Sequence, residues 1–146
     1  MSDFAVCNYE NKKIYVGSGN GKIVGYDLKQ NEWNICPKNL ENPRRNHSMC
    51  CLNKKLYHFF GINSMTGRPE TTVEITMGMY HKIFRVANIL ESVLRSSHLR
   101  VAPMNDNEVI ILGLGRQVWS LDADWRKQDE TRNIIELPGN RTPIDM

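Results

Sequence analysis

The sequence lacks both a long apolar run and an excess of one charge. No stretch approaches the roughly 18 apolar residues that a membrane helix needs. Met1 is followed by Ser2 and Asp3, and the first apolar stretch is short, so no secretory signal is visible. The net charge of +3 over 146 residues is too small to indicate nucleic-acid or membrane binding. We therefore expect a folded intracellular protein, cytoplasmic or nuclear, without membrane contact.

Cysteine is scarce and poorly spaced for a metal site. The four cysteines are Cys7, Cys36, Cys50 and Cys51, and none of them forms a C-x-x-C pair. Structural zinc sites usually bring their ligands in such closely spaced pairs. Without an export signal, disulfides are not expected either. The prediction is four free thiols, no metal and no cofactor.

What the sequence does contain is an internal repeat. The segment NKKIYV beginning at Asn11 returns 42 residues later as NKKLYH at Asn53, and a weaker copy, NEVIIL, begins at Asn107. Each copy runs on to a glycine at the same place, namely Gly19, Gly61 and Gly115. A second landmark repeats independently, because Arg44 and His47 return as Arg95 and His98, both displaced by 51 residues. An aromatic residue stands 11 positions before each of these arginines, Trp33 and Phe84.

Four strands per unit follow from runs of β-forming residues bounded by turn residues. A tight turn is expected at Ser18–Gly21, whose residues tolerate a positive φ. Helix is the alternative for Val86–Leu94, where apolar residues suit one helical face. The twelve expected strands are Phe4–Asn8, Lys13–Val16, Ile23–Asp27, Trp33–Cys36, His47–Leu52, Leu56–Phe60, Thr71–Thr76, Ile83–Val86, Leu99–Pro103, Val109–Leu112, Gln117–Asp122 and Asn133–Leu137.

The order of these landmarks resembles the kelch repeat. The segments PRRNHSMCCLNKKLYHFFG (43–61) and KIYVGSGNGKIVGYDLKQNEW (13–33) carry the likeness, although the double glycine of the family is reduced to Ser18-Gly19, Phe60-Gly61 and Leu114-Gly115. The resemblance implies an all-β fold of kelch-type β-propeller blades, about three four-stranded antiparallel sheets, with no BTB domain. The expected blades are 2–42, 43–93 and 94–137, followed by a tail at 138–146.

Three blades are fewer than the roughly four of the smallest complete propellers, so the propeller would be incomplete. Isolated blades would leave apolar faces open. We therefore predict a protein-interaction module, a binding or scaffold subunit that forms a homodimer or docks in a hetero-complex. The alternative is a channel-site enzyme or a binder of a small ligand or metal. No nucleophile motif is present, and GSGNGK (17–22) lacks the phosphate-loop spacing, so no catalytic residue is predicted.

The candidate partner-binding residues form two groups. In kelch propellers, arginines entering the inner strands often line the channel mouth, where a protein partner such as an acidic peptide binds. By position, this carries over to Arg44 and Arg95 only. The first group adds Arg45 and Arg100, which also flank the inner strands, and the equivalent histidines His47 and His98. The alternative for each arginine is a bridge between adjacent blades through bonds to backbone carbonyls, and that for each histidine is satisfaction of neighbouring backbone groups. The second group, in an irregular loop at Met77–Lys82, is Met77, Met79 and Tyr80.

Overall fold

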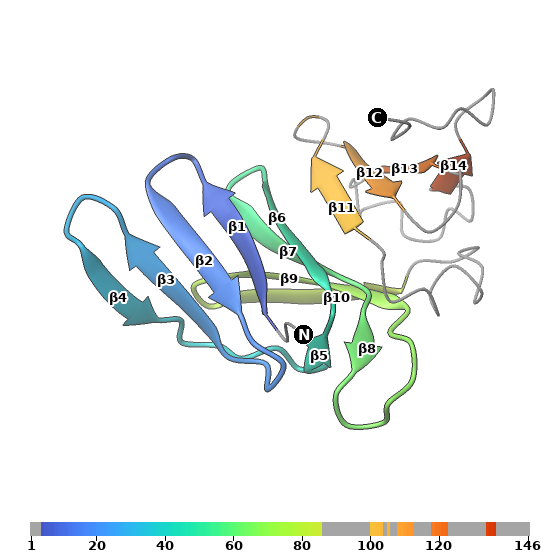
Figure 1. Ribbon diagram of the computed structural model, residues 1–146, viewed down its shortest axis with the longest axis horizontal. Coiled ribbons are helices and arrows are strands. Elements are labelled where there is room, and N and C mark those ends of the chain that lie inside the picture. The colour runs from blue at the N-terminus through green and yellow to red at the C-terminus, as the bar shows by residue number, and fades with distance from the viewer. Residues whose placement is uncertain are drawn as a thin grey trace.

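A computed structural model describes residues 4–85, 100–103, 105, 108–112, 118–122 and 134–136. Every regular element among these residues is a β-strand, so the prediction of an all-β fold is confirmed. The strands form three four-stranded antiparallel sheets and one two-stranded sheet (Figure 1). No helix in this part of the chain has the length and apolar character to cross a membrane.

Sheet 1 is a meander whose four strands pair in chain order. Its turns are built from residues that tolerate positive φ, including Asn11, Gly21 and Asn31. The Asp27 carboxylate accepts hydrogen bonds from the backbone N–H groups of Lys29 and Gln30, which closes the last turn. The strands are β1 (Ala5–Tyr9), β2 (Lys13–Gly17), β3 (Ile23–Asp27) and β4 (Glu32–Ile35).

Sheet 2 repeats this meander, with a two-stranded sheet beside it. Its strands are β6 (Ser48–Leu52), β7 (Lys55–Phe59), β9 (Thr72–Met77) and β10 (Tyr80–Arg85), and the small sheet pairs β5 (Arg44–Arg45) with β8 (Ile62–Asn63). One element was not expected, and one expected strand needs correction. The short β5–β8 ladder was not foreseen, and β10 begins at Tyr80 rather than Ile83. Met77–Lys82 is therefore a regular hairpin turning at Gly78, which has a positive φ, and not an irregular loop.

Sheet 3 has the same strand order. It consists of β11 (Arg100–Pro103), β12 (Glu108–Leu112), β13 (Val118–Asp122) and β14 (Ile134–Glu136). All twelve expected strands therefore have a counterpart, with ends that differ by up to three residues. The alternative helix at Val86–Leu94 and the tail at 138–146 lie outside the described residues.

The three sheets share one register, which makes their faces comparable. The first pairs of the first two strands are Ala5 with Gly17, Ser48 with Phe59, and Arg100 with Leu112. Side chains alternate between the two faces along each strand. We call the face that carries Ala5, Ser48 or Arg100 the forward face of its sheet, and the opposite face the rear face.

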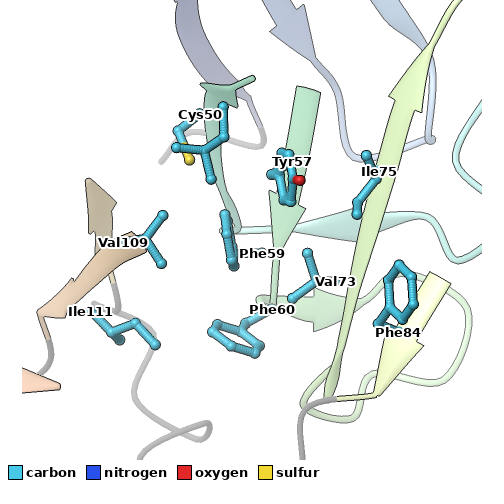
Figure 2. Packing of buried hydrophobic residues seen from close by; sticks show 10 residues of the cluster. Cys50, Tyr57, Phe59, Phe60, Val73, Ile75, Phe84, Val109 and Ile111 are labelled. Atoms are coloured by element: carbon cyan, nitrogen blue, oxygen red, sulfur yellow. The ribbon is translucent and has the colours of Figure 1, made fainter. Parts of the chain in front are cut away.

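Each of the two sheet interfaces joins a forward face to a rear face. Between sheets 1 and 2 lies one core cluster, Ala5, Cys7, Tyr15, Ile23, Leu40, Met49 and Leu56. Between sheets 2 and 3 lies a larger one, Cys50, Leu52, Tyr57, Phe59, Phe60, Val73, Ile75, Phe84, Val109 and Ile111 (Figure 2). Strand β6 contacts β1 and β11, so the first strands of the three sheets are neighbours. The forward face of one sheet thus packs on the rear face of the next, twice in succession.

Candidate interaction surfaces

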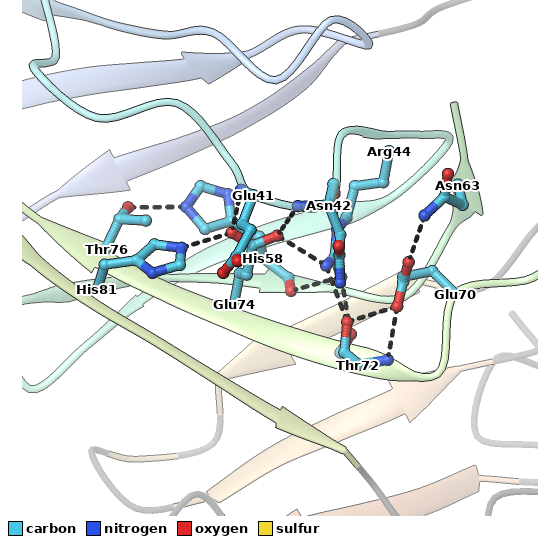
Figure 3. Close-up of polar contacts among 10 residues, drawn as sticks. All are labelled: Glu41, Asn42, Arg44, His58, Asn63, Glu70, Thr72, Glu74, Thr76 and His81. Carbon is cyan, nitrogen blue, oxygen red and sulfur yellow. Dashed lines mark hydrogen bonds and ion pairs between the residues drawn. The ribbon is translucent and has the colours of Figure 1, made fainter. Parts of the chain in front are cut away.

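Arg44 lies inside the molecule, with a side-chain exposure of 0%. Its Nε donates to the carbonyl of Asn42 at 3.1 Å, and Nη1 donates to the carbonyls of His58 and Thr72 at 3.2 and 2.7 Å. Nη2 donates to Thr72 Oγ1 and to Glu74 Oε1, both at 3.0 Å (Figure 3). These five contacts match the five donors of a guanidinium group. Arg44 therefore bonds backbone carbonyls, as its structural alternative expects, although these belong to sheet 2 and the segment before it, and its buried side chain exposes no donor to a partner.

Glu74 is the second buried member of this network, also with 0% side-chain exposure. Besides Arg44, its carboxylate accepts hydrogen bonds from the backbone N–H groups of Glu41 and Asn42 at 2.7 and 2.9 Å, and contacts His81 Nε2 at 2.7 Å. Glu41 and Asn42 belong to the segment that connects sheets 1 and 2. The network thus fixes this connection to the rear face of sheet 2. Neither Glu74 nor its neighbour His58 was singled out from the sequence, because isolated residues on a strand give no motif.

A cavity of about 270 Å³ lies where β1, β6 and β11 begin. Its lining is Phe4, Ala5, Val6, Asn46, His47, Ser48, Met49, Arg100 and Val101. The structure thus brings two of the predicted residues, His47 and Arg100, to one cavity. The predicted residues Arg95 and His98 lie outside the described part of the chain.

His47 is buried, and neither ring nitrogen has a hydrogen-bond partner among the described residues. Its ring centroid lies 6.2 Å from that of His58, whose Nε2 contacts Thr76 Oγ1 at 2.9 Å. Burial, followed by the charge of Arg44, lowers the pKa of His47 to about 3. The ring is therefore neutral near pH 7 and offers one donor and one acceptor.

Gly61 allows the backbone to pass close to Arg45 and His47. Its φ is +85°, and a Cβ there would lie 2.5 Å from the carbonyl oxygen of Arg45 and 2.8 Å from Cβ of His47. A side chain would therefore displace the backbone that positions His47.

The remaining predicted residues do not form one patch. Arg45 is exposed on β5 and is not among the residues that line the cavity. Met77 is half-buried and packs against the core between sheets 1 and 2. Met79 is exposed at the β9–β10 turn, and the ring of Tyr80 lies 5.1 Å from Lys55 Nζ and 5.9 Å from Lys82 Nζ. No group of three or more His, Cys, Asp and Glu that could hold a metal ion occurs within the described ranges.

The rear face of sheet 1 is an apolar surface that the sequence analysis did not identify. Cross-strand pairing places Val6, Val16, Val24 and Ile35 in one row, and Ile14, Tyr26 and Trp33 in the next. Val6 is 59% exposed, Trp33 62% and Ile35 77%. The Trp33 ring packs on Tyr26 with centroids 4.9 Å apart, so the surface is continuous across β3 and β4.

A signal for this surface was present in the sequence. Both faces of the predicted strands in the first unit carry apolar residues, as in Ile14-Tyr15-Val16 and Ile23-Val24. Such a pattern indicates a sheet covered on both sides. Within the described part of the chain, sheet 2 covers the forward face of sheet 1, whereas the rear face exposes Val6, Trp33 and Ile35.

Comparison with known proteins did not identify a family for this chain. Neither the family models nor the curated proteins gave a significant match to the chain.

Proposed function

We propose that this chain is a protein-interaction module built of kelch-type propeller blades, and that the rear face of sheet 1 is its docking surface. The observation that carries the proposal is the exposure of Val6, Trp33 and Ile35 on one face of a sheet. Contiguous apolar surface of this kind marks interaction sites in soluble proteins. Trp and Tyr, both present here, are enriched at the centres of interfaces.

Two features support the kelch-type assignment. The first is the threefold recurrence of a four-stranded antiparallel meander, which is the form of a propeller blade. The second concerns Phe60-Gly61, at the position of the double glycine in the family. Both residues have a positive φ, 55° for Phe60 and 85° for Gly61, which glycine adopts without strain and phenylalanine rarely does. The backbone therefore has the conformation that a glycine pair favours, despite the phenylalanine.

The test is capture of partners by the immobilised protein, with two variants matched in chemistry. Ile35→Lys places a charge on the rear face of sheet 1, whereas Met79→Lys places one on an equally exposed apolar residue at the β9–β10 turn, the alternative binding group that the sequence predicted. Because both side chains are exposed, both variants should fold, which circular dichroism verifies. We expect Ile35→Lys to lose the partner and Met79→Lys to retain it. Unchanged capture by Ile35→Lys would contradict the proposal.

The second candidate function is a ligand site in the cavity beside His47. It is favoured by one observation, a buried imidazole whose nitrogens have no partner in the described structure. Arg100 borders the same cavity, so the chemistry fits the carboxylate of a small ligand or of an acidic peptide. Calorimetric titration with a glutamate-rich peptide, acetate and Zn²⁺ tests it. Binding that His47→Phe abolishes would support this candidate, and the absence of heat with all three would remove it.

A further inference from the structure

We infer that the partner on the rear face of sheet 1 is a second copy of this chain, docked through the forward face of its sheet 3. This inference rests on the proposed function and names the partner of the same surface. It follows from the order in which the sheets pack. The forward face of sheet 1 covers the rear face of sheet 2, and the forward face of sheet 2 covers the rear face of sheet 3.

Among the described residues, two sheet faces take no part in these contacts. One is the rear face of sheet 1, with Val6, Trp33 and Ile35 exposed. The other is the forward face of sheet 3, where Arg100 and Ala102 are exposed and Ile110 is half-buried. They lie on the first and last of the three sheets (Figure 1). One chain therefore exposes one rear face and one forward face, the two kinds of face that pack together at both of its internal sheet interfaces.

The register predicts which residues would meet. Ala102 stands in sheet 3 where Cys7 stands in sheet 1, and Val6 stands in sheet 1 where Met49 stands in sheet 2. Cys7 and Met49 belong to the same buried cluster between sheets 1 and 2. In the dimer, Ala102 of one copy would accordingly pack near Val6 of the other, so that β11 of one copy lies next to β1 of the other.

Two copies joined in this way use the head-to-tail contact twice. Such heterologous contacts give a closed ring if the rotation closes and an open filament if it does not. Two copies supply twice the three four-stranded sheets of one chain, and the total of six falls within the roughly four to eight blades of closed propellers. The ring would cover the rear face of sheet 1 and the forward face of sheet 3 in both copies.

The experiment measures the mass of the full chain in solution by sedimentation equilibrium, with charges placed on the two faces. We expect the wild type to reach twice the mass of one chain at high micromolar concentration. Val6→Glu and Ala102→Lys should each raise the dimer dissociation constant about tenfold or more, because each buries a charge without a partner. A mixture of the two variants should regain dimer, since one of its two contacts pairs Glu with Lys and the other is wild type. Met65→Lys, at an exposed residue that belongs to no predicted site, is the control and should behave as the wild type.

The outcomes separate this inference from the proposed function. Weakening by Val6→Glu alone, without an effect of Ala102→Lys, would mean that two rear faces meet each other, which overturns the head-to-tail arrangement. A wild type that stays monomeric at all concentrations would overturn the second copy as partner. In that case the proposed function still stands if Ile35→Lys loses a captured protein that Met79→Lys retains, and it fails together with the inference if capture is unaffected.

Discussion

The rear faces of sheets 1 and 2 occupy equivalent positions and have opposite character. The covered face, on sheet 2, carries buried charged and polar side chains, among them His58, Glu74 and Thr76. The uncovered face, on sheet 1, is more apolar and exposes Trp33 and Ile35. Polarity therefore does not explain why the face of sheet 1 is open. A face that is more apolar than its buried equivalent is suited to burial by a partner.

The difference also shows how a polar face is kept stable inside a protein. The ion pair between Arg44 and Glu74 has 0% side-chain exposure on both sides, and every donor of the guanidinium has an acceptor. Burial of a charge costs little only when such partners are complete. The rear face of sheet 2 is thus specific to the connecting segment that it binds, whereas the rear face of sheet 1 has no comparable polar set.

The largest effect is expected from breaking the buried ion pair. Glu74→Ala leaves the guanidinium of Arg44 without its counter-ion, which should lower the free energy of unfolding by about 3–5 kcal/mol. Urea denaturation measures this. The matched control is Glu32→Ala on β4, an exposed glutamate that should change stability by less than about 0.5 kcal/mol. Equal effects of the two variants would show that the network does not stabilise the fold.

The next largest effect is expected from truncating a buried apolar side chain, and it contrasts the two rear faces. Leu56 is buried on the rear face of sheet 2, and Leu56→Ala should cost about 2–5 kcal/mol because it leaves a cavity. Ile35→Ala, on the open face of sheet 1, should cost less than about 0.5 kcal/mol in dilute protein. Urea denaturation in dilute solution measures both. A large cost of Ile35→Ala under these conditions would mean that the face is already covered within one chain.

The third effect is a fall in stability at low pH, which should come from the two histidines buried beside the rear face of sheet 2. An unfolded histidine has a pKa of about 6.5, whereas burial, followed by the charge of Arg44, lowers the pKa of His47 to about 3. For His58, burial, followed by the charges of His47 and Arg44, lowers the pKa well below its usual value. Between the two pKa values the unfolded chain binds more protons, so stability is complete above about pH 6.5 and falls as the pH drops.

The size of this effect is about 1 kcal/mol for each histidine between pH 7.5 and 5.5. Denaturation midpoints at these two pH values measure it. His47→Phe should remove about half of the dependence, because only one of the two buried imidazoles then remains to be protonated. A stability that is equal at both pH values would contradict the burial of neutral histidines on this face.

The sequence predicted the strands well but not the side-chain contacts of Arg44 and Glu74, and the reason is physical. Strand positions follow from local features, such as the repeated NKK-aliphatic-Tyr segment and the glycine and asparagine turns, and these are visible one unit at a time. The roles of Arg44 and Glu74 depend on a contact between residues 30 positions apart, which neither segment reveals alone. The repeat left two roles open for Arg44, because a recurring arginine fits a structural position as well as a binding site.

The apolar rear face of sheet 1 also depends on contacts between distant segments. Apolar residues on both faces of β2 and β3 were readable from the sequence, but which of the two faces finds a cover depends on the packing of whole sheets. The two-residue strands β5 and β8 likewise depend on pairing across a loop, since Arg45 and Ile62 carry no strand pattern of their own.

The central claim is that the rear face of sheet 1 becomes covered when the protein associates. Hydroxyl-radical oxidation, read residue by residue by mass spectrometry, tests it most directly. As the protein is concentrated, oxidation of Val6, Trp33 and Ile35 should fall severalfold, while that of Met65 and Met79, which are exposed elsewhere, stays constant. Oxidation of Trp33 and Ile35 that remains unchanged from dilute to concentrated protein would contradict the account.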